Sequence, residues 1–391
     1  MIDINILNKL NASTREERIA NLREVMKAAP LPPRKPKYIN NHIHTTYSFS
    51  PYSPTASVFA SLAEGLCTAG IIDHDSISGA EEFLEAAKIC ELPATIGMEC
   101  RVSMRNTEFA NRRTNNPDQV GISYMTIQSV PHNKISVLDE FFAPYREARN
   151  RRNRKMVDNI NALLPDVGLD FERDVLPLSL HSEGGSVTER HLMYALAKKL
   201  TEQTGKGDAM ISRLFELGLK LSDKQKSQMS DTDYPFYEYD LLGILKGAFV
   251  PKIYVDADEE CPSLCDVVAL CKKVDACLAY AYLGDVTSSV TGDKAAQKFE
   301  DDYLDELFAF LHREGVRAIT YMPTRNTKDQ LIRLRTLCDD YKMFQISGED
   351  INSPRQSFII RAMEDEMFSN LIDATWQLIR HEENGEKLPI E

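Results

Sequence analysis

Residues 38–44 read YINNHIH, residues 70–75 read GIIDHD and residues 94–98 read ATIGM. Each is a short run typical of a buried strand, and helical periodicity at 58–69 and 79–90 separates them. Strands that alternate with helices at this spacing form βαβ units, in which the strands are parallel. The pattern therefore predicts a parallel sheet whose functional groups lie at the carboxyl ends of its strands.

The same alternation returns in the last third of the chain. Three helices are each followed by a strand: 263–273 by 276–282, 301–314 by 316–322, and 327–340 by 342–347. We therefore expect one α/β barrel-like domain rather than two separate units, which is compatible with a length of 391 residues.

Two segments lie outside this alternation. Ser13 and Glu16 form a capping box that begins a helix, and a proline-rich connector follows it, so we expect residues 1–37 to form a helical arm. The barrel domain then spans 38–391. Within it, the periodicity weakens and aromatic residues gather at about 201–260, which we interpret as a helical insertion over the barrel mouth.

The composition narrows the class of protein. The chain carries 46 Lys and Arg residues against 59 Asp and Glu residues, a net charge of −13. This balance disfavours an extended nucleic-acid surface or a polybasic membrane anchor, because both rely on cations. No apolar run reaches the roughly 18–20 residues of a membrane span, and the N-terminus lacks a signal-peptide pattern. Eight cysteines without a CxxC pair fit a reducing compartment. We expect a cytoplasmic protein with no membrane partner.

A long amphipathic helix is expected over 139–165. Phe142, Met156 and Ile160 recur on one face of it as an apolar stripe. The arginine-rich run from Arg146 to Arg154 could bind phosphate, but such a run more often forms the solvated face of a helix. We therefore expect these arginines to face solvent.

Histidines and carboxylates follow the ends of the predicted strands. His42 and His44 lie two residues apart on one strand, so both side chains point the same way. His74 lies between two aspartates at the end of the second strand, and Glu99 ends the third. An isolated histidine pair is weak evidence, because edge strands also carry surface histidines. Imidazole and carboxylate groups on three successive strand ends, however, form a set of ligands that suits divalent metal ions.

These residues resemble the opening motifs of the polymerase-and-histidinol-phosphatase (PHP) family of metal-dependent phosphoesterases, at His42 to Ser48 (HIHTTYS), Ile72 to Ser76 (IDHDS) and Gly97 to Glu99 (GME). Later segments extend the resemblance, namely Thr188 to His191 (TERH) and Ile346 to Ser353 (ISGEDINS), so that it runs from about 38 to 360. The resemblance implies a PHP-type distorted (β/α)7 barrel that holds divalent ions at the carboxyl ends of its strands. It also implies hydrolysis of phosphate esters by a metal-bound hydroxide.

The resemblance assigns metal ligands one position at a time. Seven residues occupy ligand positions of the family: His42, His44, His74, Glu99, His191, Asp350 and Asn352. His74 would belong to a second site and His191 to a third. The first site would take its ligands from His42, His44, Glu99 and Asp350, with Glu99 bridging to a neighbouring site. Asn352 stands where the family has a histidine, and its uncharged amide would hold an ion more weakly. We expect His74 and Asp350 to act in catalysis as well.

Several family positions are changed in this chain. Phe49 and Ser50 occupy the stretch that usually supplies a ligand after the histidine pair, and Tyr280 stands in place of the histidine of an Ala-His-Pro motif. Tyr124 lies where a histidine is expected after the third strand, unless His132 replaces it. We therefore expect a complete first site and thinned second and third sites.

The expected cofactors are one to three divalent ions per chain. Imidazole with carboxylate accepts Mn²⁺, Zn²⁺ or Fe²⁺, and Mg²⁺ is a further candidate. Arg325 and Arg355 follow predicted strand ends and are the candidate phosphate-binding residues. The expected substrate is a small phosphomonoester, a nucleotide or the end of an oligonucleotide. Homo-oligomer formation through the arm at 1–37 is left open.

Two functions stay open at this point. The first is a metal-dependent phosphoesterase. The second is a catalytically impaired protein on the same barrel, which binds a phosphorylated ligand or metal without turnover. Ligand-type residues in four distant segments, at 42, 99, 191 and 350, favour the enzyme, because a purely structural barrel does not require them.

Overall fold

One mixed sheet of seven strands forms the centre of the protein, and neighbours in the sheet follow the order of the chain. The computed structural model describes residues 3–28, 30–286 and 297–390. The strands are β1 (Lys35–Ile43), β2 (Leu66–His74), β3 (Ala94–Ser103), β4 (Ile122–Gln128), β5 (Cys277–Ala281), β6 (Ala318–Tyr321) and β7 (Phe344–Ser347).

The sheet curls until its edges meet. Ile351, just beyond β7, forms a parallel bridge with Ile43 at the end of β1. The His44 amide donates a hydrogen bond of 2.9 Å to the Ile351 carbonyl, and the Ile351 amide donates one of 3.0 Å to the His42 carbonyl. The result is a nearly closed, distorted (β/α)7 barrel, which confirms the predicted fold class.

The prediction of a parallel sheet is wrong for one strand. β4 runs antiparallel to both β3 and β5, whereas the other neighbouring pairs are parallel. Residues 104–121, between β3 and β4, contain no crossover helix, and a parallel return of the chain would need one. The amino end of β4 therefore lies at the barrel end where the carboxyl ends of the other strands meet.

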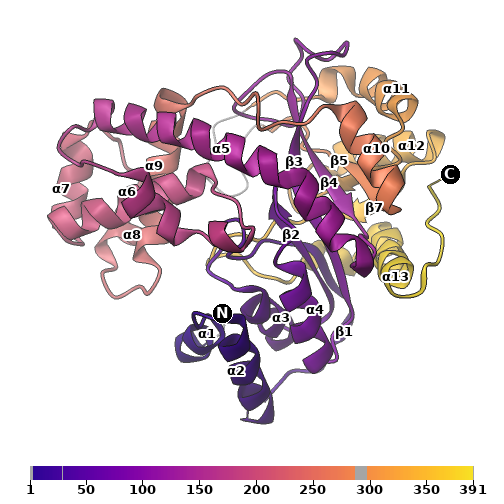
Figure 1. Cartoon of the computed structure of the whole chain (residues 1–391), viewed down its shortest axis with the longest axis horizontal. Helices are drawn as coiled ribbons and strands as arrows, with labels where there is room; N and C mark the ends of the chain where they lie inside the picture. The colour runs from indigo at the N-terminus through magenta and orange to yellow at the C-terminus, as the bar shows by residue number, and fades with distance from the viewer. Residues whose placement is uncertain (1–2, 29, 287–296, 391) are drawn as a thin grey trace.

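Helices surround the sheet and extend away from it on one side (Figure 1). They are α1 (Ile4–Leu10), α2 (Arg15–Ala28), α3 (Pro54–Ala63), α4 (Ala80–Ile89), α5 (Ile135–Leu163), α6 (Glu189–Thr204), α7 (Asp208–Glu216), α8 (Asp223–Ser230), α9 (Tyr237–Ile253), α10 (Leu264–Val274), α11 (Leu304–Glu314), α12 (Lys328–Asp340) and α13 (Ser369–Asn384). Across the described ranges, none of them combines the length and the apolarity that crossing a bilayer requires.

The boundary between α3 and β2 differs from the predicted one. The sequence pattern predicted a helix to residue 69, but α3 ends at Ala63 and β2 begins at Leu66. Gly65 has a φ of +83°, in the left-handed region that ends helices and that residues with a Cβ rarely adopt. The second strand is therefore longer at its start than predicted.

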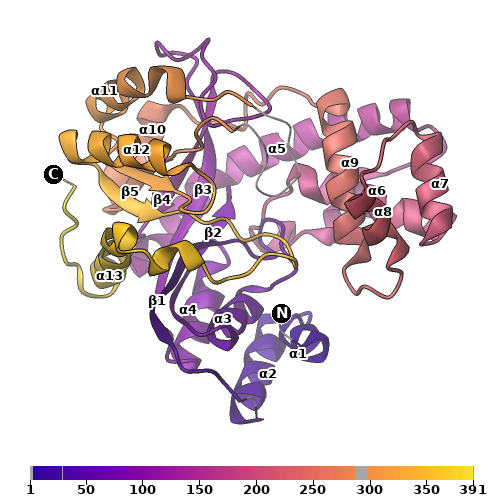
Figure 2. The same ribbon diagram turned by 180° about the vertical axis from the view of Figure 1, so that it is seen from behind.

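The helices that follow β4 form a second packing unit beside the barrel, which we call the helical unit. α5 starts next to the barrel and reaches the group α6–α9, as both views show (Figures 1 and 2). Apolar side chains between Met156 and Ile253 form a cluster of their own, which also takes in Phe49 from the loop after β1. Segments ahead of residue 201 thus belong to the same unit as the expected insertion at 201–260, whose boundaries stay a prediction.

The arginines of α5 do not all form a solvated face, contrary to the prediction. Arg146, Arg149 and Arg152 are buried, whereas Arg151 and Arg154 are exposed. The predicted apolar stripe of the same helix is buried as expected. Arg149 and Arg152 pair with carboxylates of other elements, which the periodicity of one helix does not reveal. Arg146 pairs with Asp139 of the same helix.

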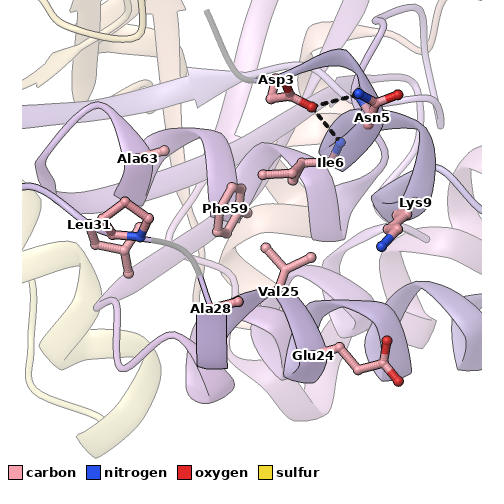
Figure 3. Close-up of a pocket in the computed structure, with 11 residues that line it drawn as sticks. Asp3, Asn5, Ile6, Lys9, Glu24, Val25, Ala28, Leu31, Phe59 and Ala63 are labelled. Atoms are coloured by element: carbon pink, nitrogen blue, oxygen red, sulfur yellow. Dashed lines mark hydrogen bonds between the residues drawn. The ribbon is translucent and has the colours of Figure 1, made fainter.

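The N-terminal arm packs against the barrel helices through a buried ion pair. Arg18 of α2 donates to Glu82 of α4 at 2.6 Å and 2.8 Å, and Glu82 also accepts a hydrogen bond from Thr55 of α3. Beside this contact, α1, α2 and α3 line a cavity of about 620 Å³, whose wall includes Val25 and Phe59 (Figure 3). None of the predicted metal ligands lines this cavity.

α13 packs across the amino-terminal end of the barrel. Ser129, which follows β4, donates to the Leu378 carbonyl at 2.9 Å. His381 Nε2 lies 2.7 Å from the carbonyl of Asp275, just ahead of β5. Interior residues of β5, β6 and β7 pack against the same helix. The opposite end, where the parallel strands end, is therefore the end available for a site.

Glu382 is a buried carboxylate of α13. It accepts hydrogen bonds from the Thr95 hydroxyl and the Ile96 amide at the start of β3. Burial raises the pKa of Glu382 to about 7, against the effect of these bonds. Because this pKa lies above the ordinary value of 4.5, the folded protein holds the proton more tightly than the unfolded chain. The corresponding stability is present at acidic pH and is lost as the pH rises through 7.

We predict that Glu382→Gln removes this pH dependence, because the amide cannot ionise. Between about pH 5 and about pH 8 the variant should gain stability relative to the wild type, by on the order of 3 kcal/mol. Denaturant unfolding at several pH values measures this difference. Glu383→Gln, at the exposed neighbouring position, is the matched control and should show no such trend. A difference in unfolding free energy that does not change with pH would contradict the prediction.

Candidate metal centre

Two histidines lie where the carboxyl end of β1 meets the segment after β7. The ring centroids of His42 and His44 are 5.0 Å apart. His42 is only 4% exposed, and neither of its ring nitrogens has a hydrogen-bond partner within the described ranges. Burial lowers the pKa of His42 to about 4, so the ring is neutral at pH 7. A buried neutral imidazole with both nitrogens unpaired is unsatisfied, and a metal ion would supply the missing partner.

A chain of hydrogen bonds sets the protonation of His44. The Ser48 hydroxyl donates to the Asp73 carboxylate at 2.6 Å, and Asp73 also accepts from the Thr45 amide at 2.7 Å. Ser48 has a single hydroxyl hydrogen, so His44 Nδ1 must be the donor in its 3.2 Å contact with Ser48 Oγ. The proton on Nδ1 leaves the Nε2 lone pair of the neutral ring available for a metal.

Asp350 faces this Nε2 atom across the seam of the barrel. Its Oδ1 lies 3.2 Å from His44 Nε2. Burial disfavours a charged His44, but the neighbouring carboxylate outweighs it and raises the pKa of His44. Burial would likewise raise the pKa of Asp350, yet the His44 imidazole holds it below its usual range. A divalent ion between these groups would take the Nε2 lone pair and the Asp350 carboxylate as ligands.

Asn352 forms hydrogen bonds with the Asp350 carboxylate. Its amide nitrogen donates to both carboxylate oxygens, at 2.8 Å and 3.0 Å. A carboxylate only accepts hydrogen bonds, so the nitrogen rather than the oxygen of the amide must face it. The structure therefore places Asn352 next to a candidate ligand, and its expected role as a ligand itself stays a prediction.

A second pair of candidate ligands lies on β2 and β3. His74 and Glu99 are register partners at the ends of these strands, with 2.8 Å between His74 Nδ1 and Glu99 Oε2. Burial would raise the pKa of Glu99, but His74 lowers it below its ordinary value. A Cβ atom at Gly97 would lie 2.2 Å from the Ile127 carbonyl, so the close approach of β3 and β4 beside this pair requires glycine.

The ends of β1, β2 and β3 and the segment after β7 bring five of the predicted ligands into two overlapping groups. Within the described ranges, the groups are His42, His44 and Asp350, and His44, His74 and Glu99. In each group the candidate ligand atoms lie within 4.8 Å of one another. The His44 and His74 ring centroids are 4.4 Å apart, so ions held by the two groups would be neighbours. Nitrogen with carboxylate oxygen suits Zn²⁺, Mn²⁺ or Fe²⁺, and the residues present therefore fit a divalent ion.

The candidate metal centre is open to solvent on one side. The side chains of Asp350 and His74 are 39% and 22% exposed, whereas His44 is fully buried. A substrate would therefore reach the centre from the side of Asp350 and His74.

His191 belongs to neither group. It lies in the first turn of α6, where its Nδ1 accepts a hydrogen bond of 3.0 Å from the Thr188 amide. Its ring packs edge-on against Phe49, with 5.0 Å between centroids, and burial lowers the pKa of His191 to about 3. These contacts are those of a helix cap, and a role of His191 as a metal ligand stays a prediction.

The other substituted family positions lie in different surroundings. Tyr124 is near the centre, with its ring 6.3 Å from that of His74. Tyr280 packs in the main apolar cluster with the outer helices, whereas its neighbour Ala279 belongs to the interior cluster. His132 follows the carboxyl end of the antiparallel β4, at the far end of the barrel. The structure therefore places His132 away from both ligand groups.

The two predicted phosphate-binding arginines already have partners. Arg355 donates two hydrogen bonds of 2.7 Å to Asp240 of α9 and lies over the ring of Tyr234. Arg325 donates to the Leu283 carbonyl at 3.0 Å, and burial lowers its pKa. Phosphate binding by these residues stays a prediction.

Sequence reasoning missed the residues that support the ligands. Ser48 lies within the quoted HIHTTYS motif, and its spacing of four residues from His44 was a usable signal. The burial of Arg149, which was also missed, had no signal of its own, because in the sequence this residue resembles the exposed arginines of the same helix.

Two solved structures share this barrel fold. The fold is similar to that of a protein from Bifidobacterium adolescentis ATCC 15703 that is provisionally described as a metal-dependent phosphoesterase, with 18% identity, a TM-score of 0.53, and coverage of 87% of this chain and 98% of that one. It is also similar to an amidohydrolase from Chromobacterium violaceum, determined with bound sulfate and no metal, with 17% identity, a TM-score of 0.52, and coverage of 83% of this chain and 90% of that one. At these identities the likeness is one of fold. No protein-family model and no curated protein matches the chain.

We predict that Ser48→Ala weakens Zn²⁺ binding by about 10- to 100-fold, because His44 loses the acceptor that keeps its proton on Nδ1. Isothermal titration with Zn²⁺ measures the affinity. Ser61→Ala is the matched control, since Ser61 is also buried but donates to the Ser57 carbonyl within α3, and its affinity should equal that of the wild type. Equal Zn²⁺ affinities for Ser48→Ala and the wild type would show that Ser48 does not orient a ligand.

Proposed function

We propose that the protein is a divalent-metal-dependent hydrolase that acts on the phosphoester bond of a small phosphorylated substrate, a nucleotide or an oligonucleotide end. The observation that carries the proposal is the pair of overlapping ligand groups at the open end of the barrel. Buried, unpaired imidazoles lower stability and a barrel does not need them for folding. Titratable groups gathered at an accessible position with shifted pKa values indicate a functional site.

The residues of each group have distinct tasks in this proposal. His42, His44 and Asp350 would hold one ion, and His74 with Glu99 would hold a neighbouring one. Divalent ions at these positions would supply Lewis-acid activation of water and offset the negative charge of a phosphate ester.

Hydrogen bonds within the chain orient the candidate ligands without a substrate. Ser48 and Asp73 keep the His44 proton on Nδ1, and Asn352 fixes the carboxylate of Asp350. His74 and Asp350 are the accessible members of the centre, which supports their expected catalytic role. The buried rings of His42 and His44 exclude water from the opposite side.

The structural neighbours support hydrolysis but leave two substrate classes. The neighbour provisionally described as a metal-dependent phosphoesterase favours phosphoesters. The second neighbour is described as an amidohydrolase, and it makes amide hydrolysis the second candidate function. The sulfate in that second structure is a tetrahedral oxyanion like phosphate.

The alternative of a binding protein without turnover also has a specific basis. Phe49 occupies a position where the resembling family supplies a ligand, and Tyr280 is packed among outer apolar side chains. Fewer ligands would hold fewer ions, so we propose one or two ions rather than three.

We predict that the protein hydrolyses p-nitrophenyl phosphate or bis(p-nitrophenyl) phosphate when Mn²⁺ is present. Chelator should abolish the reaction and added Mn²⁺ should restore it. Asp350→Asn should lower kcat/KM by about 100-fold or more, because the centre loses a charged ligand. His312→Ala, at an exposed position on α11, is the control and should leave the rate unchanged.

The outcomes separate the three functions. Turnover of amide substrates in place of phosphoesters would favour the second candidate function. Metal binding without turnover of either class would favour the impaired binding protein. Phosphoester hydrolysis that neither chelator nor Asp350→Asn reduces would contradict the proposed site.

A further inference from the structure

The residue that follows His74 has an unusual backbone conformation. Asp75 has a φ of 50°, in the left-handed region that few non-glycine residues adopt. Such a conformation persists only where the surrounding structure imposes it. The path of the chain directly after His74 therefore depends on what holds Asp75.

Three contacts hold Asp75, and two of them come from α5. Its amide donates to the Glu99 carbonyl at 2.7 Å, which ties the ends of β2 and β3 together. Arg146 of α5 donates to the Asp75 carbonyl at 3.2 Å. Arg149, one helical turn further along, forms an ion pair with the Asp75 carboxylate, and both side chains are 4% exposed.

Arg149 also ties this position to the helical unit. Its other terminal nitrogen lies 2.7 Å from Glu189, in the first turn of α6. Glu189 in turn pairs with Arg152 at 2.7 Å and with Arg101 at 3.6 Å. Arg101 lies two residues beyond Glu99 on β3. The residue directly after His74 and the residue two positions after Glu99 are therefore part of one buried ion-pair network.

Stability alone is a weak reason for such a network. Taking several charges out of water is unfavourable, and well-packed apolar side chains in their place are often as stable or more stable. The network includes residues that are close in sequence to His74 and Glu99, two members of the second ligand group. It also contacts Asp75, which follows a candidate ligand and has a left-handed backbone conformation.

We propose that Arg149 is a positioning residue of the candidate metal centre. By holding Asp75 in the left-handed conformation, it keeps the His74 imidazole beside Glu99, so that the helical unit completes the second ligand group. The inference rests on the proposed metal centre and adds a role for the helical unit in its assembly.

The test is a titration of the full chain with Co²⁺, whose visible absorption reports both affinity and coordination. Arg149→Met should weaken Co²⁺ binding by about 10- to 100-fold and change the spectrum in the same way as His74→Ala. Arg151→Met is the matched control on the same helix, because Arg151 is exposed and pairs only with the exposed Glu259 among the described contacts. This control should bind Co²⁺ like the wild type.

A second variant separates positioning from folding. Arg149→Met leaves Asp75 buried, charged and unpaired, and it could destabilise the fold for that reason alone. Asp75→Gly combined with Arg149→Met removes the unpaired carboxylate and lets the backbone adopt the left-handed region without strain. The double variant should therefore fold and recover most of the lost Co²⁺ affinity and the wild-type spectrum.

Each outcome decides one part of the account. Wild-type affinity and spectrum in Arg149→Met would overturn the positioning role and leave the metal centre intact. A folded double variant that binds Co²⁺ no better than His74→Ala would also overturn that role, because relief of the backbone strain would then not matter. Absence of Co²⁺ binding by the wild type would overturn the proposed metal centre and this inference with it.

Discussion

The seam that closes the barrel is the contact on which the candidate metal centre depends. Two backbone hydrogen bonds join the histidine-bearing end of β1 to Ile351, and they bring Asp350 to within 3.2 Å of His44. Neither side of the seam is a sufficient ligand set, since one carries only imidazoles and the other only a carboxylate and an amide. Closure of the sheet therefore creates the first ligand group, and the fold and the site have the same physical origin.

The second ligand group depends on parallel register rather than on closure. β2 and β3 end side by side, which places His74 opposite Glu99. The helical unit reaches the same position through the arginines of α5 and through Glu189 of α6. Residues ahead of the insertion expected at 201–260 thus contact a residue adjacent to a ligand.

The sequence predicted the fold class and the residues that gather at the strand ends, because strand-helix alternation and the position of a ligand after a strand are local signals. His42, His44, His74, Glu99 and Asp350 lie together in the structure, although their roles as ligands stay a prediction. The direction of β4, the burial of Arg149 and the contact of Asn352 with Asp350 were not predictable in the same way. The direction of β4 depends on the absence of a crossover helix, and the burial of Arg149 depends on partners that are distant in sequence. Asn352 lies only two residues from Asp350, but the sequence does not show that its amide nitrogen faces the carboxylate.

The most direct test of this account is the metal content of the protein, purified without chelator and measured by elemental analysis. Because the ligands come from both sides of the seam, the account predicts at least about one equivalent of divalent metal in the wild type. It predicts a clear loss in Asp350→Ala and no loss in His312→Ala. A wild-type protein that contains no metal, even after loading with Mn²⁺, would contradict the account.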